Sequence, residues 1–123
     1  MDWNKMATTL KPLRGDIWIV NLDPIVGHEQ AKKRPCLIVS NNIFNQNPSE
    51  LVVVIPLTSK YKKISWLVEI GEIRIGNVST MSYALCNHVR TVSLARFSSK
   101  PVAHIKTDTM EKIEARLRML LDL

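Results

Sequence analysis

Two clusters of basic residues border runs of apolar, strand-forming residues. One precedes such a run and the other follows one, and together they comprise Lys32, Lys33, Arg34, Lys60, Lys62 and Lys63. Polar residues lie close to both clusters in the sequence, namely His28, Glu29, Gln30, Thr58 and Ser59. Loops at one end of a compact sheet can converge, so the two clusters together favour a phosphate-binding groove. Either cluster alone would equally suit a solvated loop that only keeps the protein soluble.

Such a groove could cleave RNA, because RNA carries its own nucleophile. The 2′-hydroxyl attacks the neighbouring phosphorus if one group accepts its proton and another stabilises the negative phosphorane. The residue types that suit these roles are a cation, a hydroxyl donor and a titratable base, here Arg34, Thr58 and His28. The chain has no P-loop, GxSxG or HExxH motif and no clustered carboxylates, so we expect no metal and no cofactor.

The composition sets the broad class of protein. The 123 residues suit one domain, 46% are hydrophobic, and the net charge is +6 with a pI near 9.6, which favours a polyanionic partner. Cys36 and Cys86 lack CxxC or CxxH spacing, which predicts buried thiols in a reducing compartment. We find no signal peptide and no membrane-spanning run, so we expect a soluble, cytoplasmic protein.

The hydrophobic pattern predicts a mainly β fold. Short β-branched and apolar runs, ended by turn residues, predict strands over 15–22, 35–41, 51–58, 64–70, 79–85 and 88–93. Residues 41–50 predict a loop with one helical turn. Closely spaced short strands followed by one helix indicate a curled antiparallel sheet or small barrel.

The last 17 residues predict an amphipathic helix. One stripe at helical spacing consists of Met110, Ile113, Leu117, Leu120 and Leu121, and it favours packing against the sheet over binding a partner helix. Asp108 and Glu111 predict a capping box, with Thr107 or Asp108 as N-cap.

Few aromatic residues are available to a groove. Those that could stack on bases are Phe44, Tyr61 and Trp66, whereas Trp18 suits the core.

Three stretches of the chain resemble one family. RGDIWIVNLDPIVGHEQAKKRPCLIVSN, then VVVIPLTSK, then LCNHVRTVS are similar to the MazF/PemK family of toxin endoribonucleases, and the string DP..GHEQ....RP is quite specific. The resemblance runs from Arg14 through the terminal helix and implies a single domain over 14–123, after a loose leader over 1–13. The implied fold is an SH3-like barrel of curled antiparallel strands with the C-terminal amphipathic helix.

The resemblance also implies an activity and partners. It implies a homodimeric toxin that cleaves single-stranded RNA sequence-specifically, is inhibited by a cognate antitoxin, and binds DNA as the complex with that antitoxin. The implied cleavage products carry a 2′,3′-cyclic phosphate and a 5′-hydroxyl.

The resemblance assigns roles to individual residues. Arg34 and Thr58 match the central catalytic pair, and His28, in the GHEQ loop, matches a histidine that some relatives use. The residues expected to contact RNA are Glu29, Gln30, Lys32, Lys33, Ser59, Lys60, Lys62, Lys63, Asn87, His88 and Arg90.

The sequence departs from the family pattern at Asn87-His88. Many relatives have an acid followed by glutamine there, and in some the acid accepts the proton. Asparagine cannot, so a histidine replaces it, or Arg34 electrostatics carries the rate, or the protein is attenuated. Of the histidines we favour His28, because its loop adjoins the basic cluster and we expect His88 to point into the sheet.

Two alternative functions remain open at this point. One is a non-enzymatic toxin of the same fold class that poisons gyrase, as CcdB does. The other is a catalytically weak module that binds RNA or antitoxin.

Overall fold

The computed structural model describes residues 11–23 and 32–123. Residues 1–10, which make up most of the predicted leader, lie outside it. The predicted site residues His28, Glu29 and Gln30 also lie outside the described residues.

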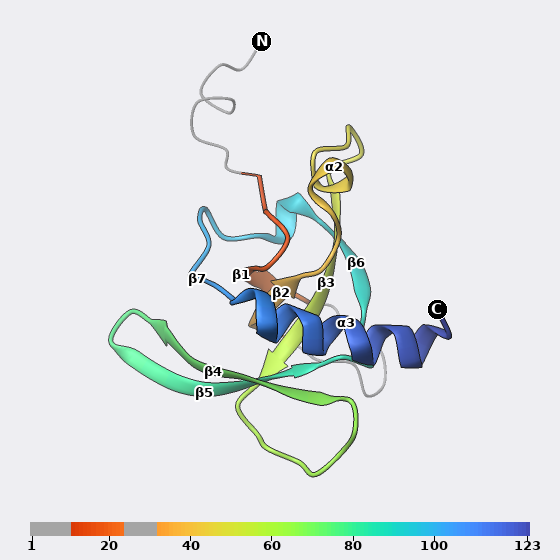
Figure 1. The fold of residues 1–123 in the computed structure, drawn as a ribbon. Helices are drawn as coiled ribbons and strands as arrows, with labels where there is room; N and C mark the ends of the chain where they lie inside the picture. The colour runs from red at the N-terminus through yellow and green to blue at the C-terminus, as the bar shows by residue number, and fades with distance from the viewer. Residues whose placement is uncertain (1–10, 24–31) are drawn as a thin grey trace.

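The described residues form seven antiparallel strands that curl into a nearly closed barrel, as predicted (Figure 1). The strand order is β4-β5-β3-β2-β1-β7, and β6 pairs with β3. The strands are β1 (Asp16–Asn21), β2 (Lys33–Ile38), β3 (Leu51–Thr58), β4 (Leu67–Ile75), β5 (Val78–Leu85), β6 (Arg90–Ser93) and β7 (Ala103–His104). The helices are α2 (Asn42–Asn45), the 3-10 helix η1 (Leu94–Arg96) and α3 (Thr107–Leu121).

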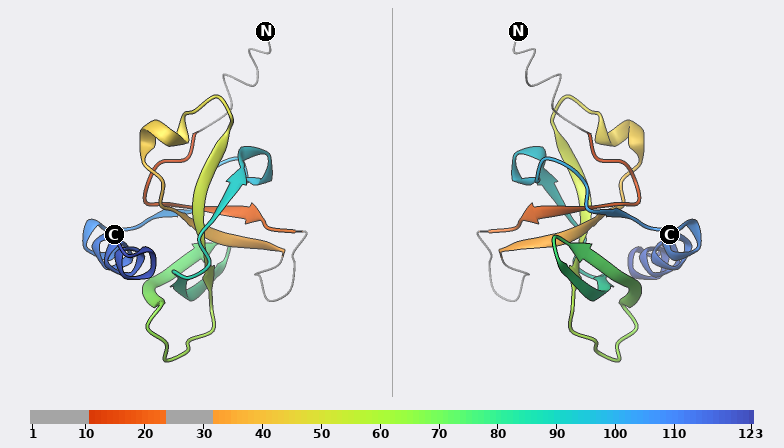
Figure 2. Two further views of the ribbon diagram at one scale, coloured as in Figure 1. Left: turned by 90° about the vertical axis from the view of Figure 1, so that its right-hand side faces the viewer. Right: turned by 90° about the vertical axis from the view of Figure 1, so that its left-hand side faces the viewer.

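The central strands bury both of their faces. Alternate side chains of a strand point to opposite faces, so Ile17 on β1 enters one apolar cluster and Trp18 enters another. The first cluster lies under α3 and the β4–β5 hairpin and includes Met110 and Ile113. The second is closed by β6 and by Phe97, whose ring centroid lies 5.8 Å from that of Trp18. Figure 2 shows α3 and the η1 segment on different sides of the β1–β2 pair. The prediction that Trp18 belongs to the core is confirmed.

Strand β3 connects the two halves of the barrel. Its first half pairs with β6, its middle pairs with β2, and its last two residues pair with β5. Pro56 lies opposite Cys36, between the β2 and β5 pairings, and it has no backbone N–H to donate. The bend in β3 carries Thr58 to the point where β2, β3 and β5 meet.

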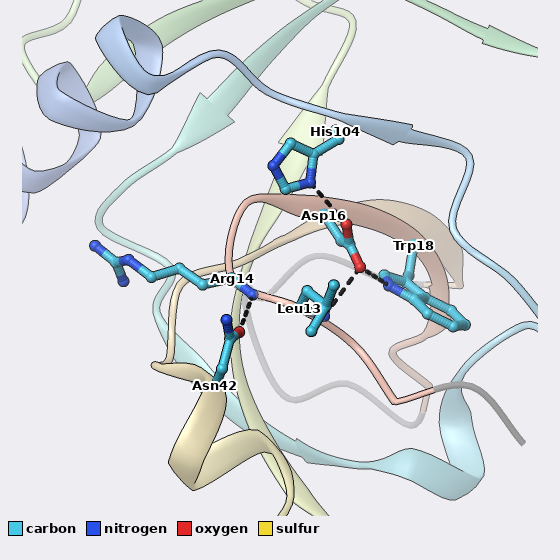
Figure 3. Close-up of polar contacts among 6 residues, drawn as sticks. All are labelled: Leu13, Arg14, Asp16, Trp18, Asn42 and His104. Atoms are coloured by element: carbon cyan, nitrogen blue, oxygen red, sulfur yellow. Dashed lines mark hydrogen bonds and ion pairs between the residues drawn. The ribbon is translucent and has the colours of Figure 1, made fainter.

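A buried carboxylate anchors the start of β1. Asp16 is 7% exposed, and its carboxylate accepts hydrogen bonds from the Leu13 backbone N–H (2.9 Å) and Trp18 Nε1 (3.2 Å). Its second oxygen lies 2.8 Å from His104 Nδ1 on β7 (Figure 3). The preceding Gly15 has a φ of 93°, and a Cβ there would come within 3.1 Å of the His104 ring. Asp16 therefore links β1, β7 and the segment that enters β1.

Helix α3 packs as its apolar stripe predicts, but its cap differs. Met110 and Ile113 are buried and Leu117 packs beside them, whereas Leu121 is 55% exposed. The predicted capping box is wrong: the N-cap is Lys106, which makes no side-chain cap hydrogen bond. Asp108 lies two residues past the N-cap, and its carboxylate accepts from the Thr109 N–H instead.

Several strand boundaries also differ from the prediction, most of all those of β2 and β4. The strand expected over 64–70 begins at Leu67 and continues to Ile75, because β4 pairs with β5 along its whole length. The strand expected to begin at Pro35 begins at Lys33, and Pro35 lies opposite Ile19 of β1. None of the helices among the described residues is long and apolar enough to cross a membrane.

Both cysteine thiols should resist modification in the folded protein. Burial raises the pKa of the Cys36 thiol to about 12, opposed by the charges of Arg90 and Arg34, and burial raises that of Cys86 to about 11. Since the thiolate is the reactive form, a thiol-reactive dye at pH 8 should label neither cysteine until urea unfolds the chain. Rapid labelling of the native protein would contradict this burial.

Candidate functional site

Strands β2 and β3 bring Arg34 and Thr58 together. Cys36 and Pro56 are the last opposed pair of β2 and β3, and Arg34 and Thr58 each lie two residues beyond it at the same end of the two strands. Both side chains are half-buried and line the same two surface pockets. The pairing of residues 24 positions apart, expected from the family resemblance, is therefore present in the fold.

Two adjoining pockets flank this pair. The first, which we call the hairpin pocket, has a volume of about 460 Å³ and extends over the β4–β5 hairpin at Ile73, Ile75 and Thr80. The second, which we call the histidine pocket, has a volume of about 440 Å³ and extends past Asn87 and His88. Arg34, Thr58 and Ser59 line both pockets. The two pockets form one groove with Arg34 and Thr58 at its centre.

Lysines are distributed along the whole groove. Lys32 and Lys33 line the hairpin pocket, and Lys60 and Lys62 line the histidine pocket. Positive charge at both ends suits a linear polyanion that passes Arg34. The predicted contact Lys63 lines neither pocket.

Arg90 lines neither pocket of the groove. It is opposite Val54 on β6, and its charge acts with that of Arg34 on the pKa of the buried Cys36 thiol. Arg90 therefore adds positive potential in the region of Cys36 and Arg34.

The turn between β5 and β6 places His88 in the groove. The His88 backbone N–H donates to the Leu85 carbonyl (2.9 Å), and the half-buried side chain lines the histidine pocket with Asn87. The expectation that His88 points into the sheet is wrong, because the turn returns it to the same pocket as Arg34. Of the two reasons for favouring His28, the direction expected of His88 therefore no longer holds.

The Thr58 hydroxyl is oriented by its neighbour. Its Oγ accepts a hydrogen bond from the Lys60 backbone N–H at 3.2 Å. A hydroxyl carries one hydrogen and can accept as well as donate, so Thr58 can still donate to a phosphate oxygen.

The three aromatic residues expected to stack on bases lie at opposite ends of β3. Tyr61 is 66% exposed, and its ring centroid lies 5.5 Å from that of Tyr83, the residue opposite Thr58 on β5. Trp66 is half-buried in the same β3–β4 connection. Phe44 lies on α2, beyond the other end of β3 (Figure 1), so its predicted role in base stacking is not supported.

Sequence reasoning missed the residues of the β4–β5 hairpin. Ile73, Thr80 and Ser82 line the hairpin pocket, but their sequence shows only an ordinary alternation of strand residues. Their position in the groove follows from the pairing of β5 with the bent end of β3.

The histidine pocket combines three chemical functions. Arg34 supplies a cation, Thr58 a hydroxyl donor and His88 a titratable nitrogen. Within residues 11–23 and 32–123, no three His, Cys, Asp or Glu side chains gather as metal ligands would. Arg34, Thr58 and His88 together can polarise a phosphodiester and move a proton.

The fold places the protein in the MazF class. A crystal structure of MazF from Deinococcus radiodurans superposes with a TM-score of 0.76 at 25% identity, covering 93% of this chain and 99% of that one. The model of the PemK-like, MazF-like toxin family of type II toxin–antitoxin systems matches residues 13–121. The chain belongs to this family.

Two relatives are similar over most of their length. The chain is 32% identical to the endoribonuclease EndoA of Bacillus subtilis over 111 residues, which cover 89% of this chain and 94% of that protein. It is also 32% identical to the endoribonuclease PemK of Escherichia coli over 111 residues, covering 88% and 80%.

Proposed function

We propose that this member of the toxin endoribonuclease family cuts single-stranded mRNA in the cytoplasm by a sequence-specific, metal-independent reaction. It acts as a homodimer and is inhibited by a cognate antitoxin. The observation that carries the proposal is the groove in which Arg34 and Thr58 lie at the junction of two lysine-bordered pockets.

The proposed reaction is an internal transesterification. The ribose 2′-oxygen forms a bond to the adjacent phosphorus, and the bond from that phosphorus to the 5′-oxygen of the next nucleotide breaks. Arg34 neutralises the charge that develops on the phosphorane oxygens, and the Thr58 hydroxyl donates to one of them. The products are a 2′,3′-cyclic phosphate and a 5′-hydroxyl.

His88 is the described residue best placed to move the proton. It lines the pocket that also contains Arg34 and Thr58, whereas the amide of Asn87 beside it cannot accept a proton from a hydroxyl. In this proposal His88 takes the 2′-hydroxyl proton, the leaving 5′-oxygen takes a proton from solvent water, and His88 then returns its proton to the solvent. The Asn87 position also motivates the alternative of an attenuated homologue that binds RNA but cuts it slowly.

The cleavage rate should rise with pH if a histidine accepts the 2′-hydroxyl proton. A general base must be neutral to accept a proton, so activity increases as the imidazole loses its proton. His88→Ala should remove the inflection and leave RNA affinity nearly unchanged, and His28→Ala is the matched comparison. Loss of the inflection in His28→Ala alone would transfer the role to His28.

The salt dependence of RNA binding should identify which lysines contact the strand. A single-strand phosphate contact contributes roughly 0.7 to the slope of log affinity against log salt. Lys62→Gln should reduce that slope by about this amount, because Lys62 lines the histidine pocket. Its neighbour Lys63, exposed and lining neither pocket, provides the matched control Lys63→Gln. Equal effects of the two changes would contradict the path of RNA through the groove.

The decisive test of the proposal is cleavage of a long mixed RNA with divalent metals chelated. We expect cuts at defined sequences with cyclic phosphate and 5′-hydroxyl ends. A short substrate built around the main site, with one 2′-deoxy nucleotide before the cut, should then be bound but not cleaved. Cleavage of the deoxy substrate, or cleavage only with added metal, would refute the mechanism.

A further inference from the structure

The two pockets of the groove differ in chemistry. The histidine pocket holds His88, the only titratable ring that lines either pocket among the described residues. The hairpin pocket has apolar walls, Ile73 and Ile75, and hydroxyl groups on Thr80 and Ser82. An asymmetric groove can accept an asymmetric strand in one direction only.

We propose that the RNA runs with the nucleotide before the cut in the histidine pocket and the base after the cut in the hairpin pocket, where Thr80 reads it. This inference rests on the proposed function. The attacking 2′-hydroxyl belongs to the nucleotide on the 5′ side of the scissile phosphate, and its proton acceptor must lie within hydrogen-bond reach. With the phosphate at Arg34 and Thr58, the leaving 5′-oxygen directs the next nucleotide away from His88 and into the hairpin pocket.

The hairpin pocket suits a single base. Its volume of about 460 Å³ is within the roughly 300–1,000 Å³ of typical small-ligand pockets. Ile75 is 40% exposed and presents an apolar surface to the face of a base, and Lys32 and Lys33 at the rim suit the flanking phosphates.

Of the two hydroxyl groups that the β4–β5 hairpin contributes to the pocket, that of Thr80 is the one available to a base edge. Ser82 is 4% exposed, and its hydroxyl already donates to the Thr80 carbonyl at 3.1 Å. The half-buried Thr80 side chain has no hydrogen-bond partner among the described residues. A hydroxyl on the hairpin wall of the pocket, away from the Arg34 and Thr58 pair, gives selectivity for a base with a matching edge.

The test is to sequence both ends of the cleavage products from a long mixed RNA. The 5′-hydroxyl ends report the first nucleotide after the cut, and the cyclic phosphate ends report the last nucleotide before it. Thr80→Val, which keeps the shape and removes the hydroxyl, should weaken the preference after the cut by roughly fivefold or more and keep the preference before it. Ile64→Ala, in the histidine pocket, should change only the preference before the cut.

Thr91→Val is the matched control, because Thr91 is exposed on β6 and lines neither pocket. It should leave both preferences as in the parent. If Thr80→Val instead changes the preference before the cut, the direction is reversed while the nuclease assignment stands. The inference is also overturned if Thr80→Val changes neither preference, or if the parent has none after the cut. A parent that does not cut RNA refutes the proposed function and this inference with it.

Discussion

Arg34→Ala should slow RNA cleavage by on the order of a hundredfold, the largest effect that we expect from one change in the groove. Removing a group that stabilises a developing oxyanion costs roughly 3 kcal/mol of transition-state free energy. Arg34 is the cation common to both pockets, so no groove lysine can replace it without leaving its own pocket. Arg34→Lys should recover part of the rate, since lysine keeps the charge but lacks the planar fork that binds two phosphate oxygens.

Single-turnover cleavage of a short substrate measures this effect directly. Thr58→Ala should have a smaller but clear effect, and Thr58→Ser should retain most activity because it keeps the hydroxyl. Arg74→Ala is the control, because Arg74 is an exposed β4 arginine that lines neither pocket. If Arg34→Ala and Thr58→Ala both stay folded and cut at the parent rate, the site assignment is wrong.

Asp16→Ala should lower the free energy of unfolding by about 2–4 kcal/mol, the largest loss of stability that we expect from one polar residue. The change removes the acceptor for the Leu13 N–H and for Trp18 Nε1, and Trp18 is only 2% exposed. A buried donor left without a partner costs roughly 1–3 kcal/mol. The contact to His104 is lost as well, but the His104 side chain is 59% exposed, so that part contributes less.

Urea unfolding followed by tryptophan fluorescence measures the loss. Asp16→Asn should be intermediate, because the amide keeps one oxygen acceptor but presents an NH₂ group where the second oxygen was. Glu72→Ala, at an exposed position of β4, should change the free energy of unfolding by less than about 0.5 kcal/mol. An Asp16→Ala protein with the parent's urea midpoint would show that the three contacts contribute nothing net.

Much of the fold was predictable because its signals are local. The apolar run predicted the position of β3 and the helical stripe predicted that of α3, since side-chain periodicity reflects which face is buried. The two-residue strand β7 was missed because so short a segment has no period to detect. The α3 cap was misassigned because several polar residues near the start could have capped the helix, and the observed N-cap uses none of their side chains.

The candidate site also has features that the sequence predicts and features that depend on the fold. The residue types could be read without a structure: two basic clusters, an Arg34 and a Thr58 that match the family pair, and an asparagine where an acid was expected. The fold was needed to show that His88 shares a pocket with Arg34 and Thr58, and that the β4–β5 hairpin forms the other half of the groove. The physical reason is that contacts between strands depend on their register and on the bend of β3, and these are set by packing across the whole barrel and not by any local pattern.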